Sequence, residues 1–159
     1  MRRSYWLGWC FAVVLGGSGC TASTGAPVAA GAPSSAPSVT KEQVQGHWTG
    51  SWGDMVLRVV GNEVWGAYAH DEGTLVGTFE NGVLRGWWSE APSRAPDADA
   101  GEVEFRFVRG ADGQLTLDGR WRYGTGEWHD DWDLAQVSGA ADPALDARFG
   151  TPAAFVRHP

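Results

Sequence analysis

The sequence predicts an all-β protein whose folded part is one eight-stranded antiparallel up-and-down barrel. Three observations support this prediction. Between His47 and Leu134 apolar and polar residues alternate with a period of two, which is typical of half-buried strands. The links between the alternating segments are short and rich in glycine, asparagine and aspartate. Glycine is also repeatedly followed, two residues later, by an aromatic residue.

The first nineteen residues are predicted to be a secretory signal peptide. Arg2 and Arg3 precede an apolar run from Tyr5 to Leu15, and small residues follow at 16–19. A basic start, a short apolar stretch and small residues before a cleavage point are typical of an export signal. The apolar run is shorter than the roughly 20 residues that cross a bilayer. We therefore expect this segment to be removed on export.

Cys20 is the expected site of a covalent lipid. Small residues immediately before a cysteine resemble the lipobox of bacterial lipoproteins, in which that cysteine becomes the acylated N-terminus. Gly17 departs from the family's large aliphatic residue at that position, which leaves an ordinary secretory signal as the alternative. The resemblance implies an exported protein anchored in the bacterial cell envelope, at the outer membrane or cell surface. With Cys10 in the leader, the mature domain has neither disulfide nor thiolate.

Residues 20–44 are predicted to be a flexible linker, because 21–40 consist almost entirely of Ala, Gly, Ser, Thr and Pro. The barrel domain is expected at 45–136, followed by a tail at 137–159 with a short helix near 143–149. Without the two arginines of the leader, ten basic and 19 acidic side chains remain, a formal charge of −9. This charge argues against nucleic acid as a partner.

Eight strands follow one another in the predicted barrel, joined by turn sequences. The three tightest links, Gly61-Asn62, Asn81-Gly82 and Asp112-Gly113, carry the residues that hairpin turns with positive φ require. The only long link is 91–101, so an up-and-down arrangement fits better than a sandwich, and closing the sheet removes its exposed edges. The expected strands are 46–52, 55–60, 63–70, 74–80, 83–90, 102–109, 114–123 and 126–134.

Seven glycine–aromatic pairs at i and i+2 indicate the inner face of the barrel, because residues two apart point the same way. A ring lying over a glycine of the neighbouring strand permits tight coiling of the sheet. The pairs begin at Gly46, Gly50, Gly66, Gly77, Gly86, Gly119 and Gly126. The rest of the expected interior is aliphatic or aromatic: Met55, Leu57, Val59, Val64, Leu75, Leu84, Val103, Phe105, Phe107, Leu115 and Leu117.

The end of the barrel that carries the longer loops is the candidate ligand-binding mouth. Those loops hold several acidic residues, with aromatic residues nearby. The candidate ligand-binding residues are Trp52, His70, Trp88, Glu90, Tyr123, Trp128 and Asp130. The alternative is a barrel filled by its own side chains, because an eight-stranded barrel has a narrow bore.

Asp130 lies at an inward position of the expected last strand, where a carboxylate would need a partner. Paired with Glu90 it would make a small hydrolase conceivable, although no catalytic motif accompanies the pair, and a non-enzymatic protein is expected. No metal site is expected either. Alternation sends neighbours to opposite faces, so His129, Asp130 and Asp131 cannot converge, and the same holds for His70 and Asp71.

The outer face is expected to carry an apolar patch formed by Trp65, Val76 and Trp87. An exposed patch of this kind typically marks a contact surface, here for homo-oligomerisation or for a partner. The alternative is that the C-terminal segment, with Leu145, Phe149 and Phe155, folds back and covers the patch.

Several of these segments resemble a repeated pattern in uncharacterised exported bacterial proteins with a Gly/Trp-rich β domain: GHWTGSW at 46–52, GAY at 66–68, GTF at 77–79, LRGWWSE at 84–90 and LDGRW at 117–121. The strand order and aromatic content also resemble avidin-like and lipocalin-like barrels, although no biotin-binding position of avidin is matched.

These features lead us to expect a non-catalytic, lipid-anchored envelope protein that binds an unknown ligand, a glycan or a small amphipathic molecule, without a cofactor. An inhibitor of a lytic enzyme, acting through the acidic loop at 91–101, is the alternative from another class.

Overall fold

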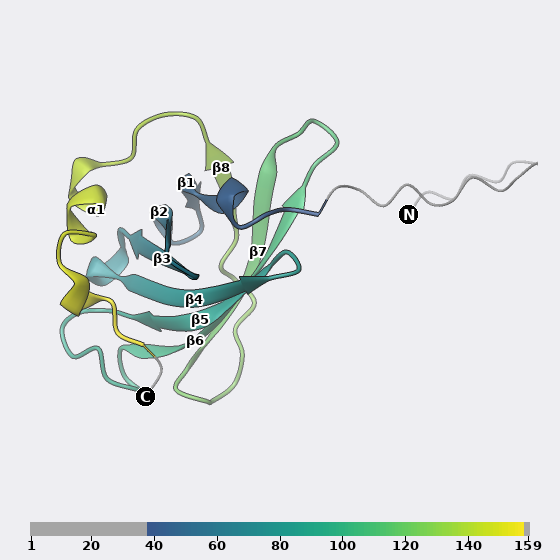
Figure 1. The fold of residues 1–159 in the computed structure, drawn as a ribbon. Helices are drawn as coiled ribbons and strands as arrows, with labels where there is room; N and C mark the ends of the chain where they lie inside the picture. The colour runs from purple at the N-terminus through teal and green to yellow at the C-terminus, as the bar shows by residue number, and fades with distance from the viewer. Residues whose placement is uncertain (1–37, 158–159) are drawn as a thin grey trace, which may run out of the picture. The chain divides into compact units, whose positions relative to one another are not determined.

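The computed structural model describes residues 38–157, so the predicted leader, Cys20 and most of the expected linker lie outside the described part. Eight antiparallel strands follow one another in sequence order and close into a barrel, as predicted (Figure 1). Pairing of the first strand with the last closes the sheet. The strands are β1 (Gly46–Gly50), β2 (Gly53–Val60), β3 (Glu63–Tyr68), β4 (Thr74–Glu80), β5 (Val83–Ser89), β6 (Ala100–Arg109), β7 (Leu115–Tyr123) and β8 (Leu134–Val137).

The expected last strand, 126–134, is wrong. After β7 the chain leaves the sheet at Gly124, where φ is +47°, and returns to β7 through a bridge between Trp121 and His129 and a backbone hydrogen bond from Trp132 to Gly119. The strand that closes the barrel is β8, which pairs Leu134 with Leu117. The loop between β7 and β8 instead lets Asp131 accept a 2.7 Å hydrogen bond from the Trp121 indole. The alternating segment 126–134 is therefore held by a few isolated backbone hydrogen bonds and by side-chain contacts, and not by a continuous strand ladder.

The interior is packed with the predicted aliphatic and aromatic side chains. The eleven aliphatic and aromatic residues expected to complete the interior are buried except Val59, which is partly buried against the same core. Of the aromatic residues in the glycine pairs, Trp52 and Phe79 are partly buried against this core, and Trp128 instead packs against Arg120 and Arg122. Register explains the role of Gly119, which pairs directly with Phe105. A Cβ on Gly119 would lie 2.7 Å from Cδ1 of Phe105 and 2.3 Å from the carbonyl oxygen of Trp132. The ring of one strand therefore occupies the space above a glycine of the next, as the pattern predicted.

One end of the barrel is closed by residues that the sequence assigned to the linker. A 3₁₀ turn, η1 (Glu42–Val44), lies beside the hairpin end, and the side chain of Val44 is completely buried. The carbonyl oxygen of Val44 accepts a 2.9 Å hydrogen bond from the indole of Trp48. Lys41 also donates to the carbonyl of Gly61, in the hairpin between β2 and β3. The ordered domain thus begins before residue 45.

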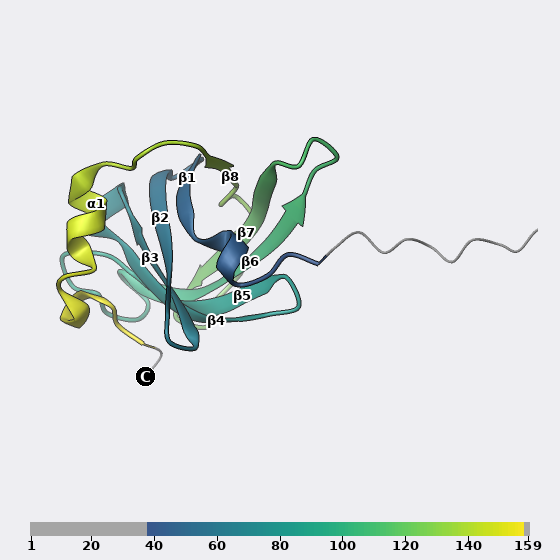
Figure 2. The same cartoon turned by 45° about the horizontal axis from the view of Figure 1, so that its top comes forward.

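The outer apolar patch is covered, so its prediction as an exposed contact surface is wrong. Trp65, Val76 and Trp87 are only 8%, 5% and 3% exposed. The Phe155 ring stacks on Trp65 with centroids 4.6 Å apart. The covering segment consists of α1 (Pro143–Arg148) and η3 (Pro152–Ala154), which run along one side of the barrel in Figures 1 and 2, with α1 against β2 and β3. The C-terminal segment covers Trp65 and Val76, which share a buried cluster with Phe155, because apolar surface is more stable out of water.

Candidate functional site

A cavity of about 140 Å³ opens at the end of the barrel opposite η1. The β1–β2 turn, the 3₁₀ turn η2 (His70–Glu72) and the loops that follow β5 and β7 surround it. Its aromatic wall is formed by Trp52, Trp88, Trp121, Tyr123 and Trp132. Its polar rim is formed by His70, Asp71, Glu90 and Asp99. The barrel therefore combines a packed interior with a hollow at the mouth, between the two alternatives that the sequence left open.

The aromatic wall is held in place by edge-to-face contacts around Trp121. The centroid of Trp121 lies 5.6 Å from that of Trp52, 5.5 Å from that of Trp88 and 5.2 Å from that of Tyr123. Edge-to-face pairs at such distances contribute about 0.5–1.5 kcal/mol each beyond the area they bury. The Trp88 indole also donates to the carbonyl of Arg122. These contacts fix the rings in place, so the cavity is formed before any ligand arrives.

Trp132 lies deeper in the same wall and carries an unusual polar atom. Its ring packs edge-on against Tyr68 and Phe105, with centroids 4.9 and 5.2 Å away. The residue is 3% exposed, and its indole Nε1 has no hydrogen-bond partner among the residues that the structure describes. A buried donor without a partner costs about 1–3 kcal/mol. A ligand oxygen in the cavity would remove this cost.

Glu90 is a half-buried carboxylate of the rim. Its Oε1 accepts a 2.9 Å hydrogen bond from the hydroxyl of Tyr68, which is itself almost fully buried. Burial raises the pKa of the Glu90 carboxyl, and the charges of Asp71 and Asp99 raise it further, against the hydrogen bond from Tyr68 and the charge of His70. Burial, followed by the charge of Glu90, likewise raises the pKa of the Tyr68 hydroxyl. The Tyr68 hydroxyl therefore stays protonated and donates to Glu90.

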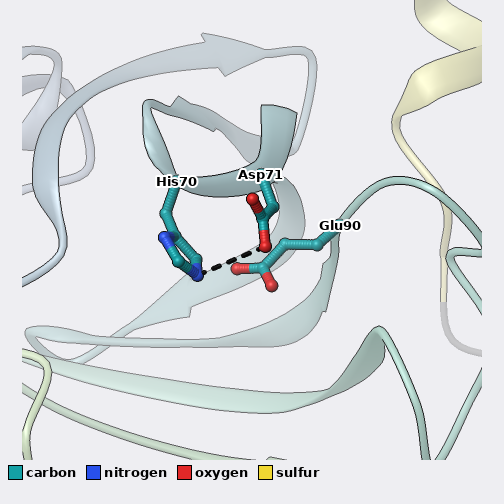
Figure 3. A group of neighbouring side chains, drawn as sticks. All are labelled: His70, Asp71 and Glu90. Atoms are coloured by element: carbon teal, nitrogen blue, oxygen red, sulfur yellow. Dashed lines mark ion pairs between the residues drawn. The ribbon is translucent and has the colours of Figure 1, made fainter.

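His70 and Asp71 point toward the same space as Glu90, contrary to the argument from strand alternation (Figure 3). The strand β3 ends at Tyr68, and His70 and Asp71 belong to the turn η2, where φ of Asp71 is +37°. Neighbouring side chains in a turn are not sent to opposite faces. His70 Nε2 lies 3.5 Å from Asp71 Oδ2, and the donor atoms of all three residues lie within 4.8 Å of one another. These residues form the one His/Asp/Glu group within 38–157 that could hold a metal ion.

Arg94 fastens the loop after β5 to the barrel. Its guanidinium donates to the hydroxyl of Thr74, to the carbonyl and hydroxyl of Ser89, and to the carbonyl of Glu72. Thr74 and Ser89 are completely buried. The loop therefore holds one side of the mouth rigidly, and Glu90 at its start is fixed with it.

No protein-family model, curated protein or solved structure matches this chain. Within residues 38–157, none of the helices has the length and apolar character needed to span a membrane.

Five of the seven predicted mouth residues line the cavity: Trp52, His70, Trp88, Glu90 and Tyr123. The other two do not. Trp128 lies under the guanidinium groups of Arg120 and Arg122, each 4.5 Å from its ring. Asp130 is exposed and borders a separate hollow of about 190 Å³ on the outer wall. The inward placement of Asp130 is wrong because the expected last strand does not exist, and Glu90 and Asp130 cannot act as one acid–base pair.

Sequence reasoning missed Trp121 and Trp132 as members of the mouth. The period-two spacing could have placed both residues on the inner face. Trp121 follows Gly119 by two residues, and Trp132 precedes Leu134 by two. The contribution of Tyr68 was missed for a different reason. A tyrosine two residues after Gly66 reads as core, and only the fold shows its hydroxyl reaching Glu90, which is 22 residues away.

A larger hollow of about 540 Å³ lies on the outer wall, beside Trp87 and Trp128. Its charged groups already have partners: Glu104 pairs with Arg85 and Arg120, Glu102 with Arg122, and Glu63 with Arg157. The mouth cavity, although smaller, has a buried donor without a partner in its wall, and none of its three carboxylates forms an ion pair with a lysine or arginine among residues 38–157. We therefore take the mouth as the candidate site.

Proposed function

We propose that this protein is a non-catalytic binding module of the bacterial cell envelope, lipid-anchored through Cys20, which takes part of a glycan in its mouth. The observation that carries the proposal is the cavity itself, which joins indole walls to a carboxylate rim and to the unpartnered Trp132 N–H. The export signal and the small residues before Cys20 support the envelope location.

The chemistry of the wall suits a sugar better than a purely apolar molecule. A sugar hydroxyl both donates and accepts, so it can donate to Asp71, Glu90 or Asp99 and accept from Trp132. The apolar C–H face of a sugar ring packs well on an indole. At roughly 30 Å³ per water molecule, 140 Å³ holds about five waters. This space fits one part of a ring, and the remainder of a glycan would project from the open mouth.

A titration followed by intrinsic tryptophan fluorescence tests the proposal. The full chain, purified in detergent, is titrated with peptidoglycan fragments and other envelope glycans. We expect a saturable change that Tyr123→Ala weakens by at least about 10-fold, the loss of about 1.4 kcal/mol of binding free energy. Tyr123 lines the mouth and is 42% exposed, so its removal spares the core.

Trp128→Ala is the matched control, because it also removes an aromatic side chain but acts on the outer wall. An unchanged affinity is expected for this variant. Equal loss in the two variants, or no response to any glycan of the panel, would contradict glycan binding at the mouth.

A further inference from the structure

We propose that His70, Asp71 and Glu90 bind a divalent transition-metal ion of the zinc type at the rim of the mouth. One imidazole and two carboxylates come together there from two separate segments, the turn η2 and the end of β5 (Figure 3). Imidazole nitrogen favours zinc-like ions over magnesium and calcium, which prefer oxygen ligands alone. This inference concerns an ion and does not depend on the proposed glycan.

The spacing of His70 and Asp71 fits a shared metal ion better than a hydrogen bond. The 3.5 Å between His70 Nε2 and Asp71 Oδ2 exceeds the usual 2.7–3.2 Å of an N–H···O hydrogen bond. Two ligand atoms that each lie about 2.0–2.2 Å from a tetrahedral zinc ion are themselves about 3.3–3.6 Å apart. The measured separation falls inside this range. Glu90 completes the set, with a carboxylate oxygen within 4.8 Å of the donor atoms of His70 and Asp71.

Backbone hydrogen bonds hold the two segments together without using the donor atoms. The amide of Ala91, next to Glu90, donates to the carbonyl of Asp71 at 2.8 Å. The amide of Gly73 closes the turn onto the carbonyl of His70, also at 2.8 Å. Tyr68 orients Glu90 by donating to Oε1, which leaves Oε2 to bind an ion. Metal ligands in proteins are generally oriented by hydrogen bonds of this outer kind.

The two carboxylates have no cationic partner from lysine or arginine among residues 38–157. Asp71 pairs only with His70, and Glu90 makes no ion pair. The nearby Arg94 directs its guanidinium to Thr74, Ser89 and the carbonyl of Glu72 instead. Like charges held this close repel one another, and a bound divalent cation would relieve that repulsion.

The cavity supplies the open side that a three-residue site requires. Three protein ligands leave a fourth position on a tetrahedral ion for water or another oxygen ligand. The site borders the 140 Å³ cavity, whose wall contains the unpartnered indole N–H of Trp132. Trp132 is itself only 3% exposed, so bulk solvent does not hydrate this donor freely. An oxygen ligand of the ion that extends into the cavity would supply the missing acceptor.

Zinc titration by calorimetry tests the proposal on the full chain, purified in detergent without a histidine tag. We expect one Zn²⁺ per chain. His70→Ala and Glu90→Gln should each weaken binding by at least about 10-fold, the lower end of what even outer-shell changes cost at metal sites. His70 is exposed and Gln keeps an acceptor for Tyr68, so both variants should fold. Co²⁺ in place of Zn²⁺ should give the visible absorption of a tetrahedral ion and quench Trp52, whose ring centroid lies 5.0 Å from that of His70.

His129→Ala is the matched control, because His129 is exposed and stacks on Trp121 but lies outside the donor set. Unchanged zinc binding is expected for this variant. The proposal is overturned if the chain binds no Zn²⁺, if His70→Ala and Glu90→Gln bind like the parent chain, or if His129→Ala loses as much affinity as they do. Because no glycan is present in this titration, such a result would leave the glycan proposal to its own test.

Discussion

At the scale of single residues, close contacts with backbone carbonyls and aromatic rings decide where the barrel requires glycine. Gly119 is the clearest case, because the carbonyl of Trp132 and the ring of Phe105 both lie where a Cβ would be. The same packing places Trp132 in the cavity wall. Gly119 of β7, which has no side chain, thus helps to position the Trp132 indole in the cavity wall.

Gly119→Ala should therefore destabilise the domain. The new methyl group would lie 2.3 Å from a backbone oxygen, which cannot move as a flexible side chain would. Overpacking of a core typically costs about 1–3 kcal/mol, and we expect a loss in this range from urea unfolding followed by fluorescence. Gly126→Ala, whose Cβ would meet only the Tyr123 carbonyl at 3.2 Å, should cost less. Equal losses in the two variants would contradict this account.

At the scale of elements, the C-terminal segment completes the wall of the barrel. Two arginine side chains hold this segment to the barrel, in addition to its apolar packing. Arg148 donates to the carbonyls of Tyr68 and Gly73, and Arg157 forms two hydrogen bonds with the carboxylate of Glu63. Glu63 also accepts from the indole of Trp65, so one carboxylate links β3 to the segment that covers it.

The contacts of Glu63 predict that the free energy of unfolding depends on pH. The hydrogen bonds from Arg157 and then from Trp65 hold the pKa of Glu63 below its ordinary value of 4.5. A carboxyl whose pKa is lowered by folding stabilises the fold above its unfolded pKa, and this contribution is lost as the pH falls through the folded value. Glu63→Gln should therefore lower the free energy of unfolding at pH 7, and the difference from the parent chain should shrink at pH 3. The same difference at both pH values, measured by urea unfolding, would contradict the prediction.

The elements also show how far the sequence could predict this fold. Period-two alternation was sufficient for β1 to β7, because each of these strands pairs with its neighbour in sequence, through short links except for the longer loop between β5 and β6. It failed for β8, because alternating residues at 126–134 are held by contacts of Trp121, Arg120 and Arg122 that come from another strand. It also failed for His70 and Asp71, because a turn of three residues has no period to detect. The cover over Trp65 depends on a contact across 90 residues, and local patterns do not report such contacts.

At the scale of the whole molecule, the proposed location depends on Cys20, which lies outside the described residues. Cys20→Ala should release the exported chain from the membrane fraction and abolish incorporation of a labelled fatty acid. Cys10→Ala is the matched control, because Cys10 lies in the expected leader and its loss should change neither result. Fractionation and fatty-acid labelling measure the two effects. A Cys20→Ala chain that still sediments with membranes and carries label would contradict the lipid anchor.

The closed end of the barrel gives the domain a direction. The chain enters the fold through η1 (Figure 1). Lys41 contacts the hairpin at Gly61 there, and the mouth opens at the far ends of the same strands. The chain therefore joins the domain at the end of the barrel that η1 closes. The opening of the cavity therefore faces away from the point where the chain enters the domain. A polymer can approach this opening without meeting the entering chain.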